Sequence, residues 1–392
     1  MRKNLRFSLP LIAVLMIAVV LPILPVSATE VEADEWTFMV YLDGDNDLDY
    51  YAYLNTADMM TVGSTDDVNI VVFWDRYDGV ANLYRVNLGG LVELDEFVLN
   101  GVEVNMGYWS TLKEFVDYTT DLYPANHYAL ILWDHGDDHR GCCWDEHPED
   151  HLTHQEISEA LFGFPLDILA FDACVEGMIE VVYEYVWSGL DIDYVVATEG
   201  YVPYEGFPYI PMLAALAANP TLDAYDFSVV MVDSYIEFYE SLRPAARLVE
   251  LASIDMESVE SIVQQLYYVA GALEEMLLEG DEGVHGIISS AKGAGNLGWS
   301  QYGWEAYIDL PSFVHTLAKR NVPGAALLAG MLEQALYVKA SRALSSAEGL
   351  GIFLPGSYAS FEHNLFWYGD YYRDMQFAIQ GWWDFLLAYW GV

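Results

Sequence analysis

Short runs of apolar residues alternate with longer amphipathic stretches along the first half of the chain. Four of the runs, 36–42, 68–74, 127–133 and 166–171, are each followed directly by an aspartate, and a fifth run spans 194–198. Strands that are apolar at every position are typical of a parallel sheet covered on both faces. Together with the intervening helix-like stretches, this order predicts an α/β fold with a mostly parallel central sheet between layers of helices.

The segments between and after these strands predict helices and a few irregular connections. Thr153 and Glu156 form a capping-box pattern at the start of one helix, and Ser110 is expected to cap another. Gly89 and Gly90 predict the turn of a hairpin, and residues 137–151 read as a loop rich in histidine and acidic residues. A helix is expected after the acidic turn at 43–49 and up to Met60. Further helices are expected over 109–122, 175–187, 223–242 and 256–278, and a late strand is expected over 349–355.

The N-terminus has the pattern of a secretory signal peptide. Basic residues at 2, 3 and 6 precede an apolar run over 9–26, and Val26-Ser-Ala28 resembles a cleavage site. We therefore expect a signal peptide over residues 1–28 and a secreted protein. The alternative is an uncleaved anchor, which would hold the protein at the cell surface.

Residues 29–392 predict one large domain whose C-terminal half is helical, because no linker-like segment interrupts them. No later segment has the length and composition of a membrane span. The aromatic tail over 382–390 contains Asp384 and is too short to cross a bilayer, so it predicts a terminal helix packed on the body of the domain.

The charge balance narrows the range of partners. The chain is 54% hydrophobic and has 15 Lys and Arg against 60 Asp and Glu, for a net charge of −45. A chain this acidic cannot neutralise phosphates, which excludes nucleic acid and disfavours anionic membranes. Basic peptides and metal cations are the partners that suit it, with weaker capture at high salt. No pattern in the sequence sets the oligomeric state.

Two of the strand ends carry residues suited to nucleophilic catalysis. His135 and Gly136 follow one strand, and Cys174 follows the next after a helical crossover. If the two strands are parallel neighbours, the imidazole and the thiol emerge side by side at one edge of the sheet. A thiol attacks carbonyl carbon, and a histidine can give a proton to the leaving amine. Taken singly, a buried cysteine or a His-Gly turn is more often structural.

The neighbouring groups extend this hypothesis. The amide N–H groups of Gly136 and Cys174 could form an oxyanion hole, and the helix expected after Cys174 would favour its thiolate. Asp172 lies two residues before Cys174, on the same face of the strand. A carboxylate opposes ionisation of a thiol, so Asp172 either pairs with a substrate Arg or Lys or caps the next helix.

At this point the sequence resembles the clostripain family of cysteine peptidases, in the same clan as caspases, legumain and gingipains. The matching segments follow one another in the same order as in the family, and together they cover nearly all of the mature chain. It rests on WTFMVYLDGDNDL at 36–48, HYALILWDHG at 127–136, residues 140–161, DILAFDAC at 167–174, 195–209 and 349–355.

The resemblance implies a caspase-like three-layer sandwich and a secreted endopeptidase with a Cys-His dyad. Cys174 is then the nucleophile that forms a thioester, His135 the general acid and base, and Asp172 the residue that selects Arg or Lys before the cleaved bond. The chemistry requires no cofactor, although some members of the family need calcium. Members often cut themselves between the His and the Cys, where the only basic residue here is Arg140.

Three other readings compete with this one. Six of the nine histidines lie in 127–154 with Cys142 and Cys143, as in a zinc-binding hydrolase or module, but without HExxH or paired CxxC spacing. Asp43, Asp45, Asp47 and Asp49 begin like a calcium loop, but residue 48 is not glycine and residue 54 is not glutamate, which excludes an EF-hand and leaves a simpler calcium site or an acidic turn. The third is an inactive surface protein that binds peptides or cations.

The number of cysteines decides whether every thiol could form a disulfide within the chain. An exported protein with Cys142, Cys143 and Cys174 has at least one thiol without a partner inside the chain. A disulfide between the adjacent Cys142 and Cys143 would be strained, and we do not expect it.

Overall fold

The computed structural model describes residues 33–242, 248–280, 283–298, 306–368 and 371–392, without the side chains of 364–368. Residues 33–392 form one compact unit. The expected signal peptide, 1–28, lies outside the described residues. Within the described ranges, no helix combines the length and the apolar character that a membrane crossing requires.

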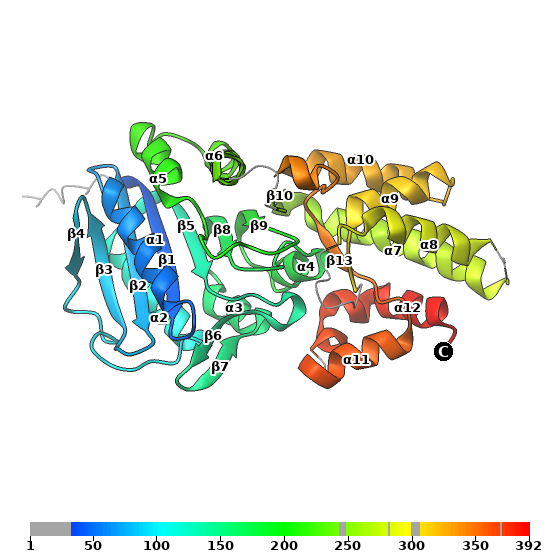
Figure 1. Cartoon of the computed structure of the whole chain (residues 1–392), viewed down its shortest axis with the longest axis horizontal. Coiled ribbons are helices and arrows are strands. Elements are labelled where there is room, and N and C mark those ends of the chain that lie inside the picture. Colours follow the sequence, from blue (N-terminus) through cyan, green and yellow to red (C-terminus); the bar gives the residue numbers. More distant parts are fainter. Residues whose placement is uncertain (1–32, 243–247, 281–282, 299–305, 369–370) are drawn as a thin grey trace, which may run out of the picture. The chain divides into compact units, whose positions relative to one another are not determined.

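Among the described residues, nine strands form the central sheet in the order β12-β10-β9-β8-β5-β1-β2-β3-β4 (Figure 1). Strands β2, β1, β5, β8 and β9 run parallel, and antiparallel strands complete both edges. The bounds are β1 Asp34–Gly44, β2 Val68–Arg76, β3 Asn82–Asn87, β4 Gly90–Glu93, β5 Ala125–Trp133, β8 Leu166–Asp172, β9 Ile192–Ala197, β10 Glu250–Asp255 and β12 Leu336–Ala340. The predicted mostly parallel α/β sandwich is confirmed.

Both faces of the sheet are buried under helices. In β1, Trp36, Phe38 and Val40 belong to one hydrophobic cluster, whereas Met39 and Tyr41 belong to the other. The first cluster includes residues of α1 (Asp49–Val62), α5 (Tyr209–Ala218) and α6 (Ala224–Leu242). The second includes α2 (Trp109–Leu122), α3 (His154–Leu161), α4 (Ile179–Trp187) and α7 (Met256–Leu278). Burial on both faces explains why the strands lack an alternating polar pattern.

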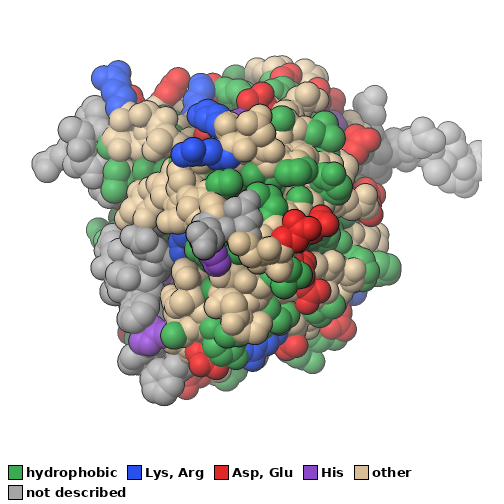
Figure 2. All heavy atoms as spheres, turned by 90° about the vertical axis from the view of Figure 1, so that its right-hand side faces the viewer, with side chains coloured by type: hydrophobic (Ala, Val, Ile, Leu, Met, Phe, Trp, Pro, Cys, Tyr) green, Lys and Arg blue, Asp and Glu red, His purple; other side chains and the backbone are tan. Residues whose placement is uncertain are grey.

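The C-terminal half adds further helices around α7 (Figure 1). These are α8 (Val284–Gly295), α9 (Leu310–Lys319), α10 (Ala325–Ala335), α11 (Tyr358–Tyr368) and α12 (Trp383–Trp390), with short turns η2 (Arg342–Leu344), η3 (Tyr372–Asp374) and η4 (Ala378–Trp382). Phe385 and Leu386 of α12 are fully buried, which confirms the packed terminal helix. Figure 2 shows the face of this half, where acidic side chains are spread among apolar ones and several Lys and Arg gather toward the upper edge.

Some local predictions were wrong or only partly right. The late buried strand is confirmed but shorter than 349–355: it is β13 (Gly351–Phe353), which pairs with β11 (Tyr307–Asp309) outside the central sheet. The expected loop over 137–151 contains the turn η1 (Asp138–Arg140) and a hairpin of β6 (Cys142–Glu146) and β7 (Glu149–Leu152). Ser110 does not cap α2, which follows Tyr108 without a side-chain cap. The capping box of Thr153 and Glu156 is confirmed.

The helix after Cys174 begins later than predicted, at Ile179 rather than at residue 175. Val175 has a φ of 53°, which is outside the helical region. Its amide donates to the carbonyl of Gly200 at 2.7 Å, and the amide of Gly177 donates to Thr198 at 2.8 Å. These bonds hold the segment against the loop after β9, so no helix dipole acts directly on the thiol.

Candidate functional site

The register of β5 and β8 sets the positions of the two predicted catalytic residues. The last register pair joins Trp133 to Asp172, and His135 and Cys174 each lie two residues beyond it. Gly136 packs against the backbone of Cys174, because a Cβ atom at Gly136 would lie 2.4 Å from the Cys174 carbonyl oxygen. The two chain segments therefore leave the sheet side by side, and only a glycine fits at this contact.

Cys174 lies in a turn between β8 and α4 and is partly exposed. Its Sγ atom is 3.8 Å from the carbonyl oxygen of Val202, in the loop after β9. Burial raises the pKa of the Cys174 thiol to about 11, and the carboxylates of Asp172 and Asp134 add to this effect. The thiol is therefore protonated at neutral pH and needs a base when it reacts.

His135 is held by a carboxylate from another strand end. Its Nε2 atom lies 2.8 Å from Oδ1 of Asp47, which belongs to the acidic turn after β1. The side chains are 42% and 73% exposed, so this is a contact at the surface. Over the described part of the chain, the ring nitrogen Nδ1 of His135 has no hydrogen-bond partner. Sequence reasoning noted Asp47 only as part of a candidate calcium loop and missed this contact.

Two backbone donors remain beside the thiol. Gly136 bridges to Cys142, but the bonds of this bridge are made by Asp137 and Cys143, at 3.0 and 3.2 Å. Among the residues that the structure describes, neither the amide of Gly136 nor that of Cys174 has a hydrogen-bond partner. These N–H groups are available to a substrate oxygen that carries negative charge.

Asp172 lies beneath this turn and is only 3% exposed. Its carboxylate accepts the N–H of Phe207 at 2.9 and 3.0 Å and the hydroxyl of Tyr209 at 2.9 Å. Burial raises the pKa of Asp172 to about 7, although these hydrogen bonds oppose the effect. Asp172 does not cap α4, whose N-cap residue Met178 has no side-chain hydrogen bond. The sequence allowed Asp172 either to pair with a substrate Arg or Lys or to cap the next helix, and the second role is not observed.

Asp134 connects the histidine to the acidic turn after β1. Its carboxylate accepts the side-chain amide of Asn46 at 2.8 Å and the backbone N–H of Trp144. The same amide of Asn46 also donates to the Trp144 carbonyl at 2.8 Å. The turn that contains Asp45, Asn46 and Asp47 is therefore tied both to the residue before His135 and to β6.

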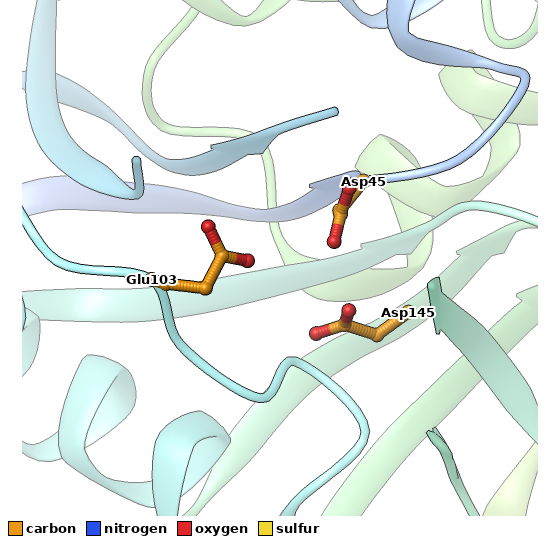
Figure 3. Close-up of side chains that lie close together, drawn as sticks. All are labelled: Asp45, Glu103 and Asp145. Carbon is orange, nitrogen blue, oxygen red and sulfur yellow. The ribbon is translucent and has the colours of Figure 1, made fainter. Parts of the chain in front are cut away.

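A group of acidic side chains lies next to this turn. Ligand atoms of Asp45, Glu103 and Asp145 all lie within 4.8 Å of one another (Figure 3). Behind them, Asp43 and Asp75 are fully buried, and burial raises the pKa of Asp75 to about 8. The sequence indicated Asp43 and Asp45, but it did not connect them to Glu103 or Asp145, which are distant in the chain.

The histidines on which the alternative zinc reading depends do not converge as a set of metal ligands among the described residues. His127 contacts Asp167, His139 contacts Asp138, and His154 contacts Tyr185. Cys142 and Cys143 are free thiols buried in the core. Within the described ranges, Asp45, Glu103 and Asp145 are the one group of three or more that could hold a metal, and the group contains no histidine or cysteine. The arrangement therefore does not favour zinc.

Arg140 is the only Lys or Arg between His135 and Cys174, so self-processing is either absent or would occur there. It lies in η1, is 7% exposed, forms an ion pair with Asp137 and stacks on the ring of Trp144. A peptidase must bind several residues around a cleaved bond in an extended form. Cleavage after Arg140 would thus require η1 and the start of β6 to open.

Comparison with known proteins agrees with this fold. The sequence model of the Clostripain family matches residues 40–390. Clostripain of Hathewaya histolytica is 32% identical over 213 residues, which cover 44% of this chain and 40% of that protein.

Two solved structures share the fold. An inactive zymogen C11 protease from Parabacteroides distasonis has a TM-score of 0.65 at 17% identity, over 88% of this chain and 98% of that chain. A secreted C11 cysteine protease from Bacteroides thetaiotaomicron, in complex with an irreversible peptide inhibitor, has a TM-score of 0.65 at 18% identity. The match covers 86% of this chain and 98% of that chain. Since the family model spans most of its sequence, the chain belongs to the clostripain family.

Proposed function

We propose that this protein is a secreted cysteine endopeptidase that cleaves polypeptides after Arg or Lys through Cys174 and His135. The observation that carries the proposal is the register of β5 and β8, from which His135 and Cys174 emerge at the same level of neighbouring parallel strands. Membership of the clostripain family supports the same activity. The chemistry uses side chains and backbone amides and requires no cofactor.

The reaction follows from the groups beside the thiol. His135 takes the proton of Cys174 as Sγ attacks the scissile carbonyl carbon, because the thiol is protonated before reaction. The amides of Gly136 and Cys174 hold the oxyanion. His135 then gives its proton to the leaving amine, which leaves a thioester on Cys174. Water hydrolyses the thioester, with His135 as the base, and restores the thiol.

Specificity for Arg or Lys is assigned to Asp172. Its carboxylate is buried two residues before the nucleophile, and its described hydrogen bonds come from an amide and a hydroxyl rather than from a cation. A substrate guanidinium or ammonium group that reaches it would supply the missing positive charge. The net charge of −45 would also draw basic peptides toward the protein.

Export is assigned to the signal-like segment over residues 1–28. The substrates are then polypeptides outside the cell. If the segment is retained, the same domain would act at the cell surface.

A fluorogenic peptide panel that varies the residue before the cleaved bond tests the activity. The wild type should cleave Arg and Lys peptides, whereas Cys174→Ala and His135→Ala should lose nearly all activity while keeping the near-UV circular dichroism of the wild type. His285→Ala is the matched control, since His285 is exposed on α8. Full activity in Cys174→Ala, or loss of activity on zinc chelation but not with iodoacetamide, would contradict the proposal.

A further inference from the structure

A buried glutamate follows the nucleophile and has no part in the reaction proposed above. Glu176 lies two residues after Cys174, in the turn between β8 and α4, and its side chain is completely buried. A carboxyl group loses its hydration when it is buried, so burial is costly unless the group forms contacts in return. The contacts that Glu176 forms lead to the other side of the catalytic site.

The side chain of Glu176 reaches the segment that carries His135 and Gly136. Its Oε1 atom accepts the backbone N–H of Asp137 at 3.2 Å, and this N–H is shared with the carbonyl of Gly141 at 3.0 Å. The same oxygen lies against Gly136, because a Cβ atom at Gly136 would be only 2.7 Å from Oε1. The carboxyl group therefore links the turn after β8 to the segment after β5.

The other carboxyl oxygen of Glu176 lies near a buried histidine. Among the described residues, Oε2 has no hydrogen-bond partner, and it is 3.6 Å from Nε2 of His154. That nitrogen is 2.6 Å from the carbonyl oxygen of Asp138, and Nδ1 is 2.8 Å from the hydroxyl of Tyr185. Because a carbonyl oxygen can only accept, Nε2 carries the proton and Nδ1 accepts from Tyr185. Burial lowers the pKa of His154 to about 4, so this ring is neutral and supplies no cation to Glu176.

The charge of Glu176 matters because an oxyanion would form close by. Burial raises the pKa of Glu176 well above its ordinary value, and nearby acidic groups, Cys174 among them, add to this effect, while Arg140 opposes it. The guanidinium of Arg140 is itself paired with Asp137. The carboxyl group is therefore protonated and uncharged at neutral pH. It can accept a hydrogen bond without adding negative charge beside the oxyanion.

We propose that Glu176 is a positioning residue that fixes the segment of Gly136 against the turn of Cys174 and so sets the distance between the two oxyanion donors. This step rests on the proposed function, in which the amides of Gly136 and Cys174 hold the oxyanion. The two donors follow different strands, and a carboxyl group on one segment that bonds to the other restrains both. Such donors are effective because they are in place before the charge develops. Loss of Glu176 should therefore lower kcat rather than raise KM.

Steady-state kinetics on an Arg peptide tests this role with three variants of the full-length protein. Glu176→Leu fills the space but offers no acceptor, and Glu176→Asp keeps the carboxyl group but shortens the side chain by one methylene. Each should lower kcat about tenfold or more with KM nearly unchanged, since a misplacement of about 1 Å can cost about 100-fold in rate. Glu176→Gln is neutral and keeps an oxygen at the same reach, so it should stay within about twofold of the wild type.

A peptide aldehyde with a C-terminal argininal separates the oxyanion hole from substrate binding. Sγ of Cys174 adds to the aldehyde carbon, and the oxygen of the adduct occupies the place of the oxyanion. The inhibition constant should therefore rise in Glu176→Leu by about the same factor as kcat falls. Glu184→Leu is the matched control, because Glu184 is also buried but accepts the amide of Phe377 in the C-terminal half. It should keep the kcat and the aldehyde affinity of the wild type.

Hydrogen exchange followed by mass spectrometry detects the same contact without any need for activity. Peptides that cover residues 134–141 and 173–178 should exchange faster in Glu176→Leu than in the wild type, Glu176→Gln or Glu184→Leu. The rest of the chain should exchange as before, because the carboxyl group bonds only across these two segments.

The outcomes separate this role from the proposed function. A wild-type kcat in Glu176→Leu and Glu176→Asp, a change in KM alone, or equal loss in Glu176→Gln and Glu176→Leu would overturn the positioning role. A lower kcat with an unchanged aldehyde affinity would also overturn it. If Glu176→Leu does not fold, Glu176→Asp decides by the same criteria. If the wild type cleaves no peptide, the proposed function fails. Exchange over 134–141 then decides whether Glu176 restrains that segment, and an unchanged rate would overturn this restraint as well.

Discussion

Asp47 and His135 lie 88 residues apart in the chain, and the carboxylate of one contacts the imidazole of the other at 2.8 Å. The contact joins the turn after β1 to the segment after β5, whose strands are parallel neighbours in the sheet. It uses Nε2, so in the proposed mechanism the other ring nitrogen, Nδ1, would carry out proton transfer. Asp47 would then orient His135 without touching the substrate.

Replacement of Asp47 by Asn should lower kcat about two- to fivefold and leave KM nearly unchanged. Exposed ion pairs contribute about 0.2–1 kcal/mol, and both side chains here are well exposed. Steady-state kinetics on an Arg peptide measures kcat and KM separately, with the exposed Asp66→Asn as the control. A rise in KM with an unchanged kcat would count against direct orientation of His135.

Asp172→Asn should reduce kcat/KM for Arg peptides at least about 30-fold and change the rate on an apolar peptide much less. Loss of one partner of a buried charge pair costs about 2–5 kcal/mol, and Asp172 is 3% exposed. Asn retains one oxygen that can accept the N–H of Phe207, so the loop should keep its place. The test is to measure kcat/KM of the wild type and of Asp172→Asn on an Arg peptide and on a norleucine peptide. A similar loss on both peptides would show that Asp172 only supports the structure.

Alkylation of Cys174 in the absence of substrate should be slow at pH 7 and should accelerate up to about pH 11. The thiolate is the species that reacts, and burial raises the pKa of Cys174 to about 11. Mass spectrometry after timed exposure to iodoacetamide gives the rate at this residue, and Cys174→Ala identifies the background from Cys142 and Cys143. A rate that is already maximal at pH 7 would reveal a preformed thiolate and would contradict the role of His135 as the initial base.

The strand ends could be predicted from sequence because the strands are apolar at most positions and lack an alternating polar pattern. The runs before Asp43, Asp75, Asp134 and Asp172 each proved to be parallel strands of one sheet, so the carboxyl ends of those strands had to meet. Helices with strong patterns, such as α2 and α7, were predicted within a residue of their bounds.

The remaining features depend on contacts between distant segments, which local patterns do not encode. Helix α4 begins late because Val175 and Gly177 bond to the loop after β9, although their own sequence is compatible with a helix. Glu103 reaches the acidic group from a segment without regular structure, so neither spacing nor periodicity pointed to it. The contact of Asp47 with His135 likewise depends on how two turns lie over neighbouring strands.

Glu184→Gln should stabilise the protein at pH 8 and have little effect at pH 4. Glu184 is buried on α4, and burial raises its pKa from 4.5 to about 7, although it accepts the amide of Phe377 at 3.2 Å. In the unfolded chain this carboxyl loses its proton near pH 4.5, whereas in the folded protein it does so near pH 7. Stability therefore falls as pH rises between these values and is constant above them. The difference of pKa corresponds to at most about 3 kcal/mol.

Because Gln is neutral and keeps an oxygen for the amide of Phe377, the substitution removes this penalty without removing the hydrogen bond. The increase in Tm over the wild type should thus be absent at pH 4, grow through pH 5–7 and level off by pH 8. Calorimetric melting of the two proteins over this range measures the difference directly and cancels the contributions of the other buried carboxylates. Glu159→Gln, at an exposed position on α3, should show no such dependence. A Tm gain that is the same at pH 4 and pH 8 would mean that better packing, and not the ionisation of Glu184, explains the effect.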